Sequence, residues 1–242
     1  MAAEANEGKR LDTVLDGVTY LRIPIKTRLI GPEDDIVEVV ASLADAELHD
    51  GDTLFVTEKI VAITQGRAFP VESILPRRLA VLLSRYVTKT PNGIGLGLPQ
   101  TMEMALRECG TPRILLATVV AAVTKSFGRR GDFYRVAGPK ARGIDGPTSG
   151  TIPPYNSQVV LAPAHPNRVA TQLRAALSTP VHVLIVDMND LGGNVIGSTL
   201  DRASTRTMER VLADNPLGQG HQSTPMGIIR IVAQGGAETS GA

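Results

Sequence analysis

The hydrophobic and polar positions along the chain follow two kinds of pattern. Short apolar runs bounded by turn residues predict buried or half-buried strands at residues 18–26, 53–57, 159–162, 181–186 and 226–232. Apolar residues at helical spacing predict helices at residues 32–46, 76–89, 98–109, 168–177 and 201–214. These strands and helices interleave without the strict alternation of a doubly wound sheet, so we expect a mixed α+β fold.

The apolar stretch RILLATVVAAVTKSF, at residues 113–127, is ambiguous. Its valine and threonine content favours a strand, because β-branched side chains fit a pleated surface. Its length also allows a helix. We expect a strand that is broken near Ala121.

The chain of 242 residues suits one large domain, which we place at residues 18–233. We expect flexible segments at residues 1–17 and at the glycine-rich end, residues 234–242. The first residues are polar and acidic where a signal peptide would be apolar, and no apolar run has the length of a membrane span. Cys109 is the single cysteine, which fits a reducing compartment. We therefore expect a cytoplasmic protein with no membrane partner.

Composition and motifs exclude several classes of function. The formal net charge is +1 and aromatic residues make up 3% of the chain, so nucleic acid is not expected as a partner. The four histidines are scattered without an HxH or HExxH pair, which argues against a zinc site. The sequence also lacks a GxSxG motif, and nothing indicates serine or cysteine nucleophilic catalysis.

Three aspartates are candidate metal ligands. Asp187 and Asp190 follow the cleanest apolar run, where the sheet would hold a carboxylate rigidly at the mouth of a crevice. Asp145 lies in the turn-rich stretch GIDGPT. Two such carboxylates from separate loops suit Mg²⁺ or Mn²⁺, which takes the rest of its ligands from water and phosphate. The alternative is that these aspartates only cap turns.

The segment VTEKIV follows another buried run and carries candidate phosphate-binding groups. Lys59 has the reach to contact a phosphate, and Thr57 has a hydroxyl that donates a hydrogen bond. The alternative is that Glu58 and Lys59 mark the solvated end of a strand.

Five segments in this order resemble the coenzyme F-420:L-glutamate ligase family. DGDTLFVTEKIVAITQGR resembles the family segment DGDxLVVTSKIVSKAEGR, and IPIK followed by PEDDIVEVV resembles its opening strand and GDDLxxLI helix. GIDGPT stands where the family has the metal-binding aspartate of NAGIDxSN. VVLAPAHPNRVATQLRAAL resembles its LLPxDPDxSAxxIR helix, and VHVLIVDMND resembles the strand that ends in its second metal-binding aspartate. The resemblance spans residues 18–232.

This family joins L-glutamate to a carboxylated acceptor, using GTP and divalent metal ions, in an intertwined homodimer whose nucleotide site lies near the subunit interface. The resemblance therefore implies a mixed-sheet, F-420 ligase-like fold and a homodimer. It makes Asp145 and Asp187 catalytic metal ligands. It implies a nucleotide (GTP or ATP) beside Arg28, Leu29, Ile30, Gly31, Thr57 and Glu58. We add Lys59 and Thr148 to the expected nucleotide-binding residues.

Several positions depart from the family pattern. Ile63 replaces a lysine, Gln65 a glutamate, Thr148 an asparagine and Met188 a hydroxyl-bearing residue. LGGNVIG stands in place of the family's GRPxRxGQ region, which is associated with coenzyme binding. We therefore expect an acceptor other than the deazaflavin coenzyme.

The expected reaction activates a carboxylate as an acyl phosphate, which an amino acid such as L-glutamate then attacks. In this interpretation Asp190 is an extra metal ligand in place of the hydroxyl missing at Met188. Glu209, Gln219 and Gln222 complete the metal or nucleotide shell, or are only polar surface residues. The alternatives are a non-catalytic nucleotide- or ligand-binding homologue, favoured by the loss of lysine at Ile63, and a metal-dependent phosphohydrolase.

Overall fold

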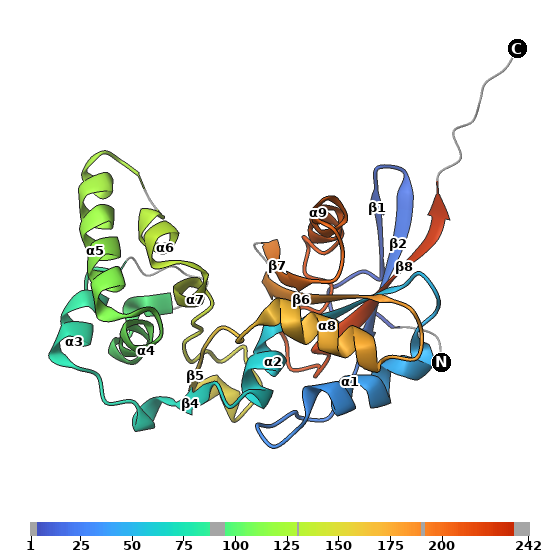
Figure 1. The fold of residues 1–242 in the computed structure, drawn as a ribbon, viewed down its shortest axis with the longest axis horizontal. Helices are drawn as coiled ribbons and strands as arrows, with labels where there is room; N and C mark the ends of the chain where they lie inside the picture. The colour runs from blue at the N-terminus through green and yellow to red at the C-terminus, as the bar shows by residue number, and fades with distance from the viewer. Residues whose placement is uncertain (1–3, 88–94, 130, 190–191, 235–242) are drawn as a thin grey trace, which may run out of the picture. The chain divides into compact units, whose positions relative to one another are not determined.

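A computed structural model describes residues 4–87, 95–129, 131–189 and 192–234. The chain divides into two compact units. One, which we call the sheet unit, consists of Met1–Thr64 and His165–Ala242. The other, the helical unit, is the continuous segment Gln65–Ala164. Along the sequence, the helical unit is thus inserted between the two parts of the sheet unit, as the colours of Figure 1 show. The expectation of one domain at residues 18–233 did not include this division.

The sheet unit is built on a six-stranded mixed sheet with strand order β1-β2-β8-β3-β6-β7. Strands β3 and β6 are parallel, and every other neighbouring pair is antiparallel. Strands β2, β3 and β6 consequently run in one direction, and their carboxyl ends meet at the same edge of the sheet. The strand bounds are β1 Asp12–Leu15, β2 Val18–Ile25, β3 Thr53–Thr57, β6 His182–Asn189, β7 Gly192–Ser198 and β8 Met226–Gln234.

Helices cover both faces of this sheet. One hydrophobic cluster joins Leu54, Val56 and Ile185 to α1 (Ile36–Ala44), α2 (Glu58–Thr64) and α8 (Pro166–Ala176). A second joins Phe55 and Leu184 to α9 (Arg202–Val211), which lies on the opposite face from α1 and α8 (Figure 1). Alternating strand residues therefore enter different clusters, which explains why β3 and β6 read as continuous apolar runs.

The helical unit packs its helices around a third hydrophobic cluster. Strands β4 (Ala68–Pro70) and β5 (Gln158–Val160) form an antiparallel pair near its two ends. The buried carboxylate of Glu103 accepts hydrogen bonds from Arg77 and Arg107. The helices are α3 Arg78–Ser84, α4 Pro99–Cys109, α5 Thr111–Ser126, α6 Asp132–Ala137 and α7 Pro139–Arg142. Short 3₁₀ turns lie at Asp45–Glu47 in the sheet unit and at Val71–Ser73, Gly95–Gly97 and Tyr155–Ser157 in the helical unit.

The mixed α+β prediction is confirmed, but the expected strand at residues 113–127 is wrong, because this stretch forms α5. Gly110 has a positive φ of 84° and Pro112 lies in the first turn, so the local sequence stops α4 and starts a new helix. Ile114 and Ala117, three residues apart, are buried, as expected for a helix that packs along one face.

The amino-terminal segment also differs from its expected flexibility at residues 1–17. Strand β1 pairs with β2, and the buried Asn6 donates hydrogen bonds to Leu217 O (2.7 Å) and Thr224 Oγ1 (2.5 Å). These contacts hold the segment against the chain that precedes β8. Gln234 is the last residue of β8, and residues 235–242 of the expected tail lie outside the described part of the chain. None of the helices in the described ranges combines the length and apolar character needed to cross a membrane.

Candidate functional site

The carboxyl edge of β2, β3 and β6 brings together three segments that the sequence singled out. These are Arg28–Gly31 after β2, Thr57–Lys59 at the junction of β3 and α2, and Asp187 near the end of β6. Thr57 is paired with Val186 across the parallel ladder, so Glu58 and Asp187 follow paired positions on neighbouring strands. In sheets of this kind, the crevice beyond the carboxyl ends of parallel strands is a common place for a ligand.

The chain that enters β8 closes the same edge. The Thr57 amide donates a hydrogen bond of 2.9 Å to the carbonyl of Pro225, and the Thr27 amide donates one of 2.8 Å to Ser223. These bonds attach the segment that contains Gln222 to the carboxyl ends of β2 and β3. Nothing in the sequence pattern pointed to Thr27, Ser223 or Pro225, because all three act through backbone atoms.

An ion pair preforms the loop after β2. Both guanidinium nitrogens of Arg28 donate to the carboxylate of Asp34, and the Gly31 amide donates to the same carboxylate at 2.7 Å. The hydrogen bonds from Arg28 lower the pKa of Asp34 to about 2, with the Gly31 amide as the next cause. Ile30 is buried in the hydrophobic cluster while Leu29 is exposed, so the loop is anchored by one side chain and closed by one ion pair.

Glu58 and Lys59 occupy the first turn of α2 and do not extend the strand, which corrects the alternative of a solvated strand end. Both side chains are partly buried. The helix begins directly after Thr57, so no loop separates the strand from these residues. The strand–helix junction fixes the backbone of Lys59 close to the edge of the sheet.

Asp187 lies inside β6, two residues before its end, and pairs with Asn194 on β7. The expectation that Asp187 follows the end of the strand is therefore wrong, and its position inside β6 does not fit the alternative of a turn cap. Leu184, Val186 and Met188 belong to the cluster under α9. Alternation along the strand places Asp187 on the other face, which α2 and α8 cover. Asp190 lies outside the described residues.

Asp145 belongs to the helical unit, whereas Asp187 belongs to the sheet unit. The Asp145 amide donates to Val160 O at 2.8 Å, and the Val160 amide donates back to Asp145 O at 3.0 Å. The backbone of Asp145 thus extends the β4–β5 pair instead of lying in a free turn. Thr148 follows in the exposed part of the loop.

The three expected auxiliary residues lie in different surroundings. Glu209 is on α9, where its Oε1 accepts a hydrogen bond of 3.0 Å from the Val195 amide. Gln219 is exposed. The Oε1 atom of Gln222 is buried and has no hydrogen-bond partner among the described residues. No group of three or more His, Cys, Asp or Glu side chains in the described ranges is arranged to hold a metal.

The structure shows the surroundings of two residues that depart from the family pattern, Ile63 and Gln65. Ile63, in place of a lysine, is only 3% exposed on the inner side of α2. Gln65 is the first residue of the helical unit, and its side-chain amide contacts Ala164, the last one.

A family model for F420-0:gamma-glutamyl ligase matches residues 24–194. The match covers well over half of the chain and supports an enzyme of the ligase type. The chain belongs to the F420-0:gamma-glutamyl ligase family, which confirms the resemblance drawn from the sequence. The matched range includes Arg28–Gly31, Thr57–Lys59, Asp145 and Asp187, and it ends before Glu209, Gln219 and Gln222. A search of curated proteins found no match to this chain.

Proposed function

We propose that this protein is a nucleotide- and metal-dependent ligase that joins an amino acid, such as L-glutamate, to a small carboxylated acceptor other than the deazaflavin coenzyme. The observation that carries the proposal is the convergence of Arg28–Gly31, Thr57–Lys59 and Asp187 at one edge of the sheet. Family membership supplies the ligase class. We further propose that the protein acts as a homodimer and uses GTP or ATP.

The nucleotide would occupy the loop after β2 and the β3–α2 junction. The ion pair between Arg28 and Asp34 gives that loop a fixed shape before any ligand binds. Lys59 offers a positive charge to phosphate oxygens, and the Thr57 hydroxyl offers a hydrogen-bond donor. A preformed loop reduces the entropy that binding must offset.

Two oxygen donors of the sheet unit, Asp187 and Gln222, have the chemistry that a hard divalent cation such as Mg²⁺ or Mn²⁺ would need. Asp187 provides a carboxylate, and Gln222 provides a buried carboxamide oxygen that lacks a hydrogen-bond partner among the described residues. Magnesium is commonly held by one or two carboxylates, with water and phosphate completing the shell. Asp145 is the second proposed ligand, and Thr148 is proposed to contact the nucleotide. When bound, the ion would neutralise the repulsion between the triphosphate and the acceptor carboxylate.

The proposed reaction has two displacements. An oxygen of the acceptor carboxylate forms a bond to the γ-phosphorus, the bond from phosphorus to the bridging oxygen breaks, and nucleoside diphosphate leaves. The amine nitrogen of the amino acid then attacks the acyl carbon, the carbon–oxygen bond to phosphate breaks, inorganic phosphate leaves, and the released phosphate takes up the proton that the amine loses. The protein residues bind and orient the phosphates and keep the acyl phosphate away from water.

Phosphate release tests the proposal. We expect Mn²⁺ and GTP or ATP to raise the melting temperature more together than separately, because ligands that bind the folded state stabilise it. Released phosphate should then depend on both a carboxylate acceptor and an amine. Release without an amine would instead indicate a phosphohydrolase. Joint stabilisation by metal and nucleotide without any release would indicate a non-catalytic homologue.

A matched pair of variants controls for simple loss of charge. Asp187→Asn should abolish metal-linked nucleotide binding and leave the fold intact. Asp50→Asn makes the same change at an exposed turn at the amino end of β3, opposite the proposed site. If both variants bind nucleotide and Mn²⁺ like the parent protein, Asp187 is not a ligand and the proposal loses its metal site.

A further inference from the structure

The two units of the chain carry opposite charges. Residues 65–164, the helical unit, contain 13 Lys and Arg but 5 Asp and Glu, which gives a formal net charge of +8. The sheet unit has the other 12 Lys and Arg and the other 19 Asp and Glu, which gives a formal net charge of −7. The near-neutral total of +1 is therefore the sum of a basic and an acidic unit, and the helical unit favours a negatively charged partner.

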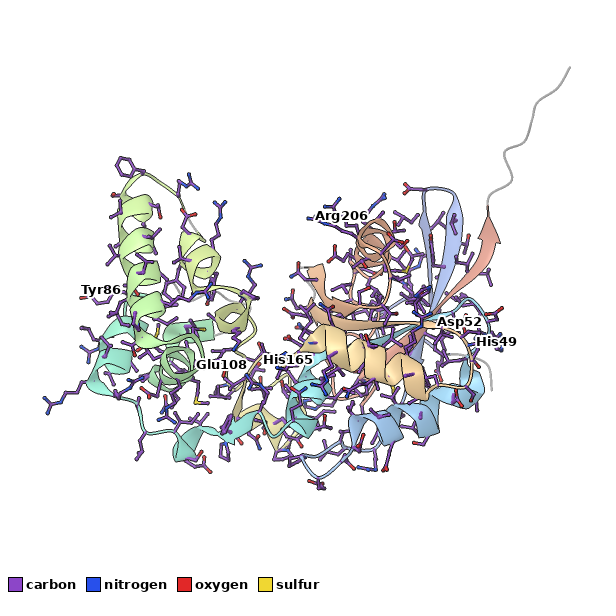
Figure 2. All side chains as sticks on the ribbon, viewed as in Figure 1. His49, Asp52, Tyr86, Glu108, His165 and Arg206 are labelled. Carbon is purple, nitrogen blue, oxygen red and sulfur yellow. The ribbon has the colours of Figure 1, made fainter. Side chains whose placement is uncertain are left out.

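Ion pairs inside the helical unit do not remove this excess. Three of its acidic side chains each meet two basic ones. The sets are Glu103 with Arg77 and Arg107, Glu108 (labelled in Figure 2) with Arg67 and Lys140, and Asp132 with Arg129 and Arg135. Because each of these carboxylates lies between two cations, the clusters themselves stay positive.

Helix α5 of this unit exposes a face of apolar side chains, which we call the α5 stripe. It consists of Leu116 (57% exposed), Val119 (60%), Val123 (54%) and, at the C-cap, Phe127 (79%). Their spacing of three and four residues places these side chains on one side of the helix, and the buried residues of α5 lie on the other side. A helix that is apolar on both sides is normally covered on both, and an exposed apolar patch marks an interaction surface.

The charges around the α5 stripe limit what can cover it. Arg113 stands three residues before Leu116 and so borders the stripe, and α5 contains no aspartate or glutamate. Packing α5 against α5 of a second copy would bring two helical units of charge +8 together without opposite charges at the contact. A nucleic acid would leave Leu116, Val119 and Val123 uncovered, because aliphatic side chains do not stack on bases as aromatic rings do. An anionic lipid surface meets both requirements, since it offers negative headgroups above an apolar layer and needs no matching groove.

We propose that the α5 stripe binds an anionic membrane surface. The stripe lies at the boundary between headgroups and acyl chains, as in other helices that lie in the plane of a membrane. The positive charge of the helical unit attracts it to the anionic headgroups, and Arg113 reaches them from the border of the stripe. This mode of binding needs no membrane-spanning helix, and it departs from the sequence-based expectation of no membrane partner. It does not rest on the proposed ligase reaction.

Sedimentation of the full chain with lipid vesicles, without nucleotide or metal, tests the proposal. The probes are vesicles of phosphatidylcholine alone and vesicles of phosphatidylcholine mixed with phosphatidylglycerol. We expect binding to the anionic vesicles to be about tenfold stronger than to the neutral ones, and to weaken as salt is raised. Val119→Ser and Phe127→Ser should each weaken binding to anionic vesicles about tenfold, because each removes apolar surface that the membrane buries.

Two matched changes serve as controls. Val14→Ser removes an exposed valine from β1 in the sheet unit and should leave vesicle binding unchanged. Ser126→Glu places a negative charge beside Phe127 and should weaken binding to anionic vesicles about fivefold relative to Ser126→Gln, which has the same size without the charge. Circular dichroism melting verifies that each variant is folded, and sedimentation velocity measures its oligomeric state.

The proposal is overturned if the parent protein does not bind anionic vesicles, if it binds neutral vesicles as tightly, or if Val119→Ser and Phe127→Ser bind like the parent. It is also overturned if these two changes alter the oligomeric state, because the α5 stripe would then be an interface between copies of this chain. Vesicle binding is measured without any substrate of the ligase reaction, so a failure here is distinct from a failure of the proposed function.

Discussion

The side-chain amide of Gln65 forms two hydrogen bonds with the backbone of Ala164. Its Nε2 donates to the Ala164 carbonyl at 3.0 Å, and its Oε1 accepts from the Ala164 amide at 2.7 Å. These two residues are the first and last of the helical unit, so one side chain joins the points where the chain enters and leaves it. A carboxamide carries its donor and its acceptor on two neighbouring atoms, so it can bond the carbonyl and the amide of Ala164 at once.

Gln65→Glu should destabilise the helical unit, since a carboxylate keeps the acceptor but loses the donor. The expected loss in the free energy of unfolding is about 1 kcal/mol, the net value of one hydrogen bond. Differential scanning calorimetry at neutral pH measures it. Gln172→Glu, the same change at an exposed position on α8, is the control and should lie close to the parent protein. Equal effects of the two changes would contradict a special role for Gln65.

Asp34 predicts a pH-dependent contribution to stability. The pKa of Asp34 is lowered from 3.8 to about 2 by its hydrogen bond to Arg28, so the folded state binds a proton less readily than the unfolded state. The stabilisation is therefore present above pH 3.8 and is lost as the pH falls through about 2. In urea unfolding, the difference between the parent protein and Asp34→Asn should narrow from pH 5 to pH 3. A difference that grows as the pH falls would contradict the sign.

Gly227 lies at the centre of the sheet, where a larger side chain is expected to overpack the core. A Cβ at this position would lie 2.7 Å from Ile23 O and 2.7 Å from Phe55 Cζ. Gly227→Ala should cost about 1–3 kcal/mol, the usual range for an overpacked core. Because Phe55→Leu removes the ring atoms, the double variant should be less destabilised than the sum of the single changes, as measured by urea unfolding. Strict additivity would mean that the ring is not the obstacle.

At the proposed site, the positive charge of Lys59 is expected to strengthen the binding of nucleotide. Lys59→Gln should weaken binding of GTP or ATP at least tenfold, because it removes a positive charge from the β3–α2 junction. Titration calorimetry in the presence of Mn²⁺ measures the change. Lys125→Gln, which removes a lysine from α5 in the helical unit, should have no effect. Nucleotide binding that is unchanged by Lys59→Gln would place the phosphates elsewhere.

The strands of the sheet unit were predictable because helices cover both faces of the sheet. Residues 53–57 form a buried strand with the expected bounds, and the run at 181–186 lies within β6 apart from its first residue. Sequence patterns failed where tertiary context decides. Valine and threonine in residues 113–127 favoured a strand, yet the break at Gly110 and the single buried face made the segment helical. The strand bound near Asp187 was missed because β6 continues beside β7 past the end of its apolar run.

The sequence predicted which side chains belong to the candidate site, but not the backbone hydrogen bonds that hold its segments together. Arg28–Gly31, Thr57–Lys59 and Asp187 were named from motifs, and the sheet brings their segments to one edge. The backbone bonds from Thr27 and Thr57 to the segment before β8 leave no trace in residue type.

The position of β8 between β2 and β3 has a consequence for synthesis on the ribosome. The helical unit is complete in the nascent chain once Ala164 has emerged, so its folding does not have to wait for the carboxyl-terminal segment. The sheet cannot close before Met226–Gln234 has been translated, because β2 and β3 have no direct pairing and meet only through that strand. Emergence of Met226–Gln234 is therefore the event that permits the carboxyl edge to assemble, and a product truncated before Met226 would lack the strand that joins β2 to β3.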